Sequence, residues 1–100
     1  MIKALVNNSW KSFDMNELQP GTSVFNFETG LYETIRTRGH GPILLTPHLD
    51  RLFNSAKSTD LKPPFHRKKV ESMIMKVIES SPEPDQRVRV LLVPDKVIIY

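Results

Sequence analysis

Arg51 is the residue whose type and position could do the most specific chemistry in this sequence. A guanidinium group binds a phosphate through two parallel hydrogen bonds and keeps its charge at any working pH. Arg51 follows Thr46, which starts a predicted helix, and the free N–H groups of a helix start also favour an anion. The position therefore predicts a phosphate site. The alternative is an arginine that pairs only with solvent or with a carboxylate.

His48 lies one helical turn before Arg51, so the two side chains share a helix face that continues to Ser55. A histidine at this position either braces the arginine or approaches the bound phosphate. A partly buried surface histidine without a role in binding is an equal alternative.

Two helices are predicted, and the first one carries His48 and Arg51. Thr46 is the expected N-cap, because its side chain can accept a backbone N–H bond, and Pro47 at the first helical position loses no needed donor. The apolar residues that follow at helical spacing should pack against a sheet and the second helix: Leu49, Leu52, Phe53 and Ala56. The second helix is predicted over residues 65–80, with a buried stripe of Val70, Met73, Ile74, Val77 and Ile78.

The remaining apolar segments predict extended structure between short turns. In chain order they are residues 2–6, 10–14, 24–27, 31–38, 43–45, 87–93 and 97–100. Alternation along the fourth segment places Tyr32 and Arg36 on one face, and Glu33 and Ile35 on the other. Strands, two helices and then strands indicate an α+β domain, with a mainly antiparallel sheet and two helices packed on one face.

Composition excludes several classes of protein. The 100 residues include no cysteine, so disulfides, zinc–cysteine sites and thiol nucleophiles are excluded, and no metal site is predicted. With 39% hydrophobic and 25% charged residues, one globular domain is expected. The N-terminus has no apolar run long enough for a signal peptide or membrane span, so a cytoplasmic protein is the default. The net charge of +3 is mild, and the basic run at residues 66–69 predicts a solvated helix face, not a nucleic-acid site.

Two linked motifs carry a family resemblance. Residues 30–36 read GLYETIR, and residues 48–52 read HLDRL, followed by Ser55 and Ala56. The first is similar to a Gly-x-[Phe/Tyr]-Glu-x-x-[Arg/Lys] strand and the second to a His-x-x-Arg-Leu helix, both of the class IV aminotransferases. This family includes D-amino-acid and branched-chain aminotransferases and aminodeoxychorismate lyase. The two motifs together, across a Gly-rich hairpin, are more specific than either alone.

The resemblance implies roles for four residues and a cofactor. The matching arginine binds the phosphate of pyridoxal 5'-phosphate, which assigns Arg51 and, beside it, His48 to the cofactor. The matching aromatic residue faces the substrate pocket, in several members that of the neighbouring subunit of a homodimer. Tyr32 would offer an apolar wall and one hydrogen-bond donor for a carboxylate. Arg36, on the same strand face, would add a cation at the pocket rim, whereas a Tyr32 that only packs on the sheet is the alternative.

The resemblance also implies what the chain lacks. The family carries its cofactor-linked lysine, and the acidic partner of the pyridine nitrogen, in a C-terminal domain. The chain ends within an apolar strand at Tyr100, and none of its lysines matches the family's, so no catalytic residue is assigned. We expect residues 1–100 to be the N-terminal small domain of an aminotransferase that acts on an amino acid or amine, inactive alone. Residues 87–96 lack the Arg-Gly pair that many members carry near the substrate, which leaves the substrate class open.

Three alternatives remain at the level of sequence. The parent enzyme could be a lyase of the aminodeoxychorismate type that uses the same cofactor. The chain could instead be a non-catalytic basic module that binds nucleic acid or an acidic partner. It could also be a subunit or regulatory domain of this family that has lost catalysis.

Overall fold

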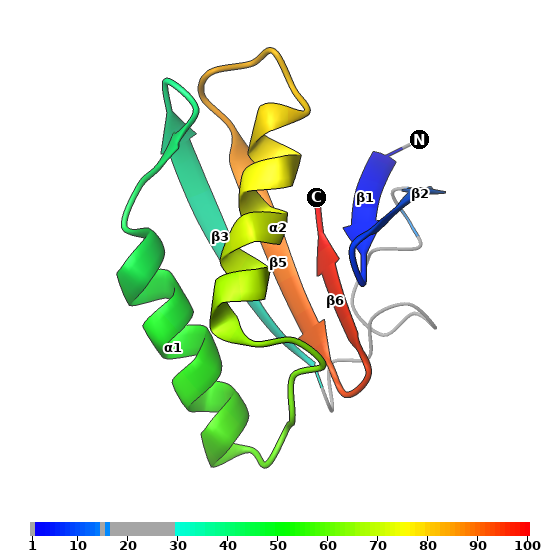
Figure 1. Ribbon diagram of the computed structural model, residues 1–100, viewed down its shortest axis with the longest axis vertical. Helices are drawn as coiled ribbons and strands as arrows, with labels where there is room; N and C mark the ends of the chain where they lie inside the picture. Colours follow the sequence, from blue (N-terminus) through cyan, green and yellow to red (C-terminus); the bar gives the residue numbers. More distant parts are fainter. Residues whose placement is uncertain (1, 15, 17–29) are drawn as a thin grey trace.

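A computed structural model of the protein describes residues 2–14, 16 and 30–100. Within these residues, two helices and six strands follow one another (Figure 1). They are β1 (Ile2–Val6), β2 (Ser9–Phe13), β3 (Leu31–Arg38), β4 (Gly41–Pro42), α1 (Leu45–Ser58), α2 (Arg67–Glu79), β5 (Arg87–Val93) and β6 (Lys96–Ile99). The extended segment expected at residues 24–27 lies outside the described residues.

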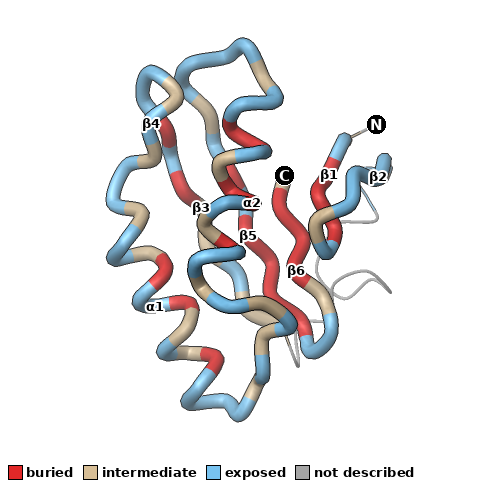
Figure 2. The backbone as a smooth tube through the Cα atoms, viewed as in Figure 1, coloured by how far each residue is buried: buried red, intermediate tan, exposed pale blue. Residues whose placement is uncertain are grey.

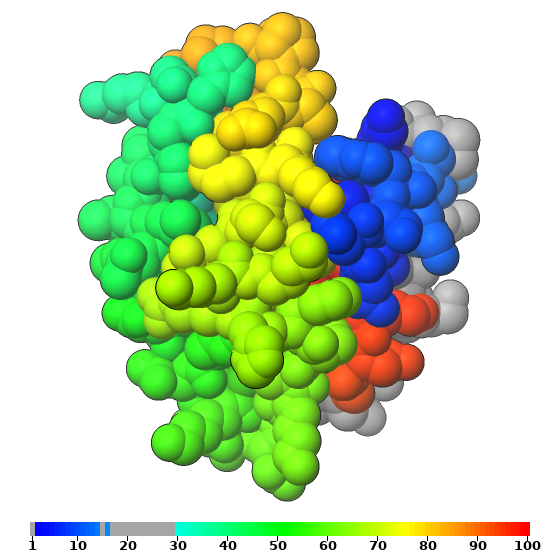
Figure 3. All heavy atoms as spheres, viewed as in Figure 1, coloured from blue at the N-terminus to red at the C-terminus, as the bar shows by residue number. Residues whose placement is uncertain are grey.

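The six strands form one antiparallel sheet in the order β2-β1-β6-β5-β3-β4. Both helices lie on the same face of this sheet, with α1 beside β3 and α2 across β5 and β6 (Figure 1). In the space-filling view the helices hide most of β3 and β5, while β1 and β6 remain visible beside α2 (Figure 3). The predicted α+β class, with two helices on one face, is confirmed.

The main core lies between the sheet and the helices, where apolar positions of both helices meet β3, β5 and β6. The whole predicted stripe of α2 is buried, as are Leu49, Leu52 and Ala56 of α1 (Figure 2). Phe53 is only partly buried, although it packs against this core. Strand alternation supplies the sheet side of the core, with Ile35 of β3 fully buried.

The opposite face of the sheet is divided into two parts. Across β1, β5 and β6 it carries a second apolar cluster, formed by Ala4, Val6, Leu91, Val93 and Ile98. The same face of β5 begins with Arg87 and Arg89, which are exposed. One strand face therefore changes from cationic and open to apolar and buried within seven residues.

The start of α1 differs from the prediction. The helix begins at Leu45, and its N-cap is Leu44, in a left-handed conformation with φ 55° and ψ 39° and without a side-chain cap bond. Thr46 is therefore inside the first turn and is not the cap. Residues 43–45 do not form a strand, because the left-handed Leu44 ends the extended backbone after Gly41–Pro42. Pro47 is tolerated because the first-turn N–H groups of a helix have no partner within it.

Candidate functional site

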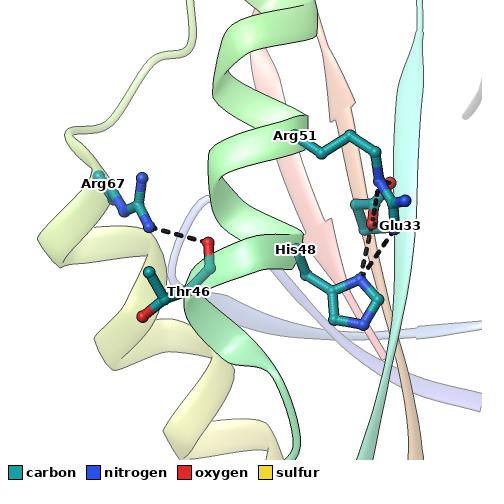
Figure 4. Close-up of polar contacts among 5 residues, drawn as sticks. All are labelled: Glu33, Thr46, His48, Arg51 and Arg67. Atoms are coloured by element: carbon teal, nitrogen blue, oxygen red, sulfur yellow. Dashed lines mark hydrogen bonds and ion pairs between the residues drawn. The ribbon is translucent and has the colours of Figure 1, made fainter.

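Glu33 brings the two predicted phosphate-binding residues together. It lies on the helix-facing side of β3, and His48 and Arg51 of α1 both point toward its carboxylate (Figure 4). Arg51 donates from Nη2 to Oε1 at 2.6 Å and from Nε to Oε2 at 3.0 Å. His48 Nδ1 lies 2.7 Å from the same Oε1. We call these three residues the Glu33 cluster.

The local sequence explains why the cluster forms. Residues three apart on a helix lie on one face, so His48 and Arg51 project from α1 in the same direction. Alternation along β3 turns Glu33 toward that helix, between Leu31 and Ile35, which contact the core. Packing of α1 on β3 then joins groups that lie 15 and 18 residues apart in sequence.

The electrostatics of the cluster favour a charged carboxylate. Burial works to raise the pKa of Glu33, but hydrogen bonds from Arg51 and His48, together with their charges, hold the pKa below its ordinary value of 4.5. The hydrogen bonds and charge of Glu33 in turn raise the pKa of Arg51. An ionised carboxylate only accepts hydrogen bonds, so His48 places its proton on Nδ1 to donate to Glu33. The Nε2 atom of His48 is the ring nitrogen left for another contact.

Among the described residues, none accepts a hydrogen bond from Nη1 of Arg51, so this edge of the guanidinium is available to a ligand. A guanidinium has five N–H groups, and Glu33 engages Nε and Nη2 but not Nη1. The side chain of Arg51 is 65% exposed, whereas that of Glu33 is 12% exposed. The carboxylate thus fixes one edge of the guanidinium and leaves the other open. A phosphate group fits this open edge in charge and in donor arrangement.

Tyr32 and Arg36 lie on the opposite face of β3 from the Glu33 cluster. Tyr32 is 51% exposed, and Arg36 is exposed as well. The four predicted site residues are therefore not one contiguous group. Arg36 nevertheless lies near the Glu33 cluster, because Arg36 and His48 line the same cleft.

That cleft has a volume of about 490 Å³. Its lining residues come from β3, β5, the turn before α1 and α1 itself: Thr34, Arg36, Ile43, Leu44, His48, Arg87 and Arg89. We call it the arginine cleft. Sequence reasoning missed Arg87 and Arg89, whose signal was the Arg-Val-Arg alternation at the start of β5.

Arg67 belongs to the basic run at residues 66–69, and it is the first residue of α2. It forms ion pairs with Asp50 of α1 and Glu71 of α2. It also donates a hydrogen bond to the backbone carbonyl of Thr46 at 3.1 Å (Figure 4). The hydrogen bond and charge of Asp50 contribute to a raised pKa of Arg67. This arginine therefore ties the two helices together at their N-terminal ends.

No three His, Asp or Glu side chains in the described ranges are grouped so that they could hold a metal ion. Among the described helices, none has both the length and the apolar composition needed to cross a membrane.

A match to a protein-family model covers both sequence motifs of the site. Residues 30–96 match the family model described as amino-transferase class IV, and they make up more than half of the chain. The chain therefore belongs to the class IV aminotransferase family. This confirms the resemblance drawn from the GLYETIR and HLDRL motifs, both of which lie within the matched range. No curated protein sequence matches the chain.

Solved branched-chain aminotransferases share the fold. The enzyme from Thermoproteus uzoniensis, solved with norvaline, has a TM-score of 0.73 and 19% identity, over 99% of this chain and 39% of that one. The Escherichia coli enzyme has a TM-score of 0.74 and 19% identity, over 97% and 38%. A third branched-chain aminotransferase, complexed with 4-methylvaleric acid, has a TM-score of 0.72 and 23% identity, over 97% and 39%. The chain thus spans less than half the length of these proteins.

Proposed function

We propose that this chain is the N-terminal small domain of a pyridoxal-phosphate-dependent aminotransferase, and that Arg51 binds the cofactor phosphate. The observation that carries the proposal is how the two edges of the Arg51 guanidinium are hydrogen-bonded. One edge is held by Glu33, and the other is open to a ligand. A side chain fixed in this way loses less conformational entropy when it binds a phosphate than a freely rotating one.

Glu33 and His48 support this role in different ways. Glu33 is the positioning residue, because its two oxygens set the plane of the guanidinium. His48 donates to Glu33 through Nδ1, which directs Nε2 away from the carboxylate. In the protonated ring that second nitrogen would supply one more donor to the phosphate. The bound cofactor would supply the electron sink for transfer of an amino group.

We assign Tyr32 and Arg36 to the substrate side of the domain. Both lie on the face of β3 that is turned away from the helices. The phenol of Tyr32 and the guanidinium of Arg36 would contact an amino-acid or amine substrate, in keeping with the family. The family resemblance further suggests a cytoplasmic homodimer for the full-length enzyme. A lyase of the same family would use the same phosphate site.

The chain alone should bind phosphate but should not transfer amino groups, because the family's cofactor-linked lysine matches none of its residues. The test is a titration of the ¹⁵N-labelled chain with pyridoxamine 5'-phosphate, followed by NMR, with pyridoxamine as the phosphate-free control. We expect the phosphorylated compound to shift the signals of His48 and Arg51. In Arg51→Ala its affinity should fall roughly tenfold to a hundredfold, and Arg51→Lys should recover only part of the loss.

Lys57→Ala is the matched control for this titration. Lys57 is an exposed cation on the same helix, two turns beyond Arg51 and outside the Glu33 cluster. Its substitution should leave the affinity for pyridoxamine 5'-phosphate nearly unchanged. Equal binding by the wild type and Arg51→Ala, or equal losses in Arg51→Ala and Lys57→Ala, would show that Arg51 is an ordinary surface arginine.

A further inference from the structure

Arg67 contacts α1 on the flank that lies opposite the Glu33 cluster. From the first position of α2 it donates from Nη1 to Oδ1 of Asp50 and from Nη2 to the carbonyl oxygen of Thr46 at 3.1 Å. Thr46 and Asp50 are four residues apart and therefore share this flank. The Glu33 cluster lies on the other side of the helix (Figure 4). The first two turns of α1 are thus held by polar contacts on both sides.

Polar contacts on two flanks fix the rotation of a helix about its own axis. The buried stripe of α1 fixes this rotation less firmly, because the hydrophobic effect has no direction, whereas a guanidinium forms its hydrogen bonds in a rigid geometry. Successive residues of an α-helix are turned by about 100° from one another, so a rotation that moves Asp50 also moves Arg51. By holding Asp50, Arg67 also holds the backbone from which the Arg51 side chain extends.

The start of α1 has little other stabilisation. Its N-cap, Leu44, has a left-handed backbone that is unfavourable for a residue with a branched side chain, and a leucine side chain cannot accept a cap bond. The residues of the first turn, all of which the structure describes, include no acidic one that would interact with the helix dipole. A helix that begins in this way should fray easily. The bond from Arg67 to the Thr46 carbonyl lies within this first turn.

The position of Arg67 is unfavourable for its own helix. A cation at the first position of α2 opposes the positive end of the helix dipole, and the neighbouring residues His66 and Lys68 supply no negative charge. Glu71 of α2 offsets this charge only at 3.5 Å, whereas Asp50 of α1 accepts a direct hydrogen bond. The contacts of Arg67 therefore favour the helix that it reaches more than the helix that carries it.

We propose that Arg67 is a positioning residue for the Glu33 cluster, and thereby for the phosphate that we assign to Arg51. The second part rests on the proposed function, because it concerns the same phosphate site. The carboxylate of Glu33 sets the plane of the Arg51 guanidinium, and Arg67 sets the position of the helix that carries it. Arg67 does not itself contact the phosphate, because it lies on the other side of α1 (Figure 4).

Charge and position predict opposite results for Asp50→Asn. If only nearby charge matters, removal of a carboxylate beside Arg51 should tighten the binding of pyridoxamine 5'-phosphate. We expect weaker binding instead, by about threefold to tenfold, because the contact with Arg67 is lost. Arg67→Ala should have a similar effect, and the double variant should bind about as weakly as Arg67→Ala alone, because both changes break the same contact. Tighter binding by Asp50→Asn would overturn the proposal.

Lys68→Ala is the matched control for Arg67→Ala. Lys68 is exposed, follows Arg67 in the first turn of α2 and carries the same charge. Its substitution should leave the affinity for pyridoxamine 5'-phosphate nearly unchanged, and a loss as large as in Arg67→Ala would contradict the proposal. Arg67→Lys should recover only part of the affinity, because an ammonium lacks the paired donors that bind Asp50 and the Thr46 carbonyl together.

NMR of the phosphate-free chain provides a signature that a loss of stability alone would not produce. In fully folded samples, Arg67→Ala should shift the side-chain Nε signal of Arg51 and the ring nitrogen signals of His48, because both report the bonds to Glu33. The signals of Ile78, which is fully buried near the other end of α2, should stay in place. Unchanged signals of Arg51 and His48 would overturn the proposal, whatever the thermal stability of the variant.

The same measurements separate this proposal from the proposed function. If Arg51→Ala leaves the affinity for pyridoxamine 5'-phosphate unchanged while Arg67→Ala shifts the Arg51 and His48 signals, the phosphate assignment is wrong and Arg67 still positions the Glu33 cluster. If the affinity depends on Arg51 but on neither Arg67 nor Asp50, the phosphate assignment stands and the positioning role is wrong.

Discussion

The two faces of β3 treat their charged residues in opposite ways. On the helix side, Glu33 is mostly buried and is bonded to both His48 and Arg51. On the other side, Arg36 is exposed and faces Arg87 across the sheet. Buried charges need partners because desolvation penalises them, whereas exposed charges can remain unpaired in water. On one face, β3 positions Arg51 of α1 through the carboxylate of Glu33. On the other face, β3 itself carries the exposed Arg36.

The largest expected effect compares adjacent residues on the two faces. Ile35 is fully buried in the core between sheet and helices. Ile35→Ala should lower the free energy of unfolding by about 2–5 kcal/mol, because it leaves a cavity. Arg36→Ala should change it by less than about 0.5 kcal/mol, because the neighbouring side chain is exposed. Urea unfolding of both variants measures the difference, and similar losses would mean that the two faces are not distinct.

The sequence predicts this difference between the two faces of β3, because the alternation of residues along a strand determines which side chains are buried. Alternation along residues 31–38 separates Ile35 from Arg36, and helical spacing identifies all five buried positions of α2. The start of α1 was predicted wrongly at Thr46, because the Thr-Pro pair favours a cap locally. The conformation of Leu44, set in the turn after β4, starts the helix at Leu45 instead.

The candidate site was less accessible to sequence reasoning than the fold. The pair of His48 and Arg51 was predicted from helical spacing, but the role of Glu33 depends on how α1 docks on β3. The arginine cleft depends on the register of β3 and β5, two strands separated in sequence by both helices. No local pattern defines that register, so Arg87 and Arg89 were recognised only as part of a strand.

A smaller effect on folding stability is expected when the pH is lowered. The pKa of Glu33 is held below its ordinary value of 4.5 in the folded protein, so the folded state binds fewer protons than the unfolded chain at mildly acidic pH. The stability contributed by Glu33 is therefore fully present above pH 4.5 and is lost as the pH falls through the lowered value. In Glu33→Gln this loss should be absent.

Thermal melts of the wild type and Glu33→Gln at several pH values measure this contribution. The two proteins should differ most near neutral pH, by on the order of 1 kcal/mol or a few degrees in Tm, and should converge in acid. Asp50→Asn is the control, since Asp50 forms an exposed ion pair with Arg67 outside the Glu33 cluster. Parallel pH profiles for the wild type and Glu33→Gln would mean that the cluster does not stabilise the fold.

The smallest expected effect on stability concerns the open face of β3, the face turned away from the helices. Arg36 and Arg87 are directly opposite on the open face and have no carboxylate partner in the described part of the chain, so each repels the other. Arg87→Gln should therefore raise the free energy of unfolding by a few tenths of a kcal/mol at low salt. Added salt screens exposed charges from one another, over a distance of about 10 Å at 0.1 M and over a shorter distance at higher concentrations. The gain should therefore shrink as salt is added. Urea unfolding of the wild type, Arg87→Gln and Arg38→Gln at low and high salt separates this pair from the effect of net charge. If Arg87→Gln destabilises the protein at low salt, Arg87 already has a favourable partner, and the repulsion inferred from the register of β3 and β5 is not the dominant effect.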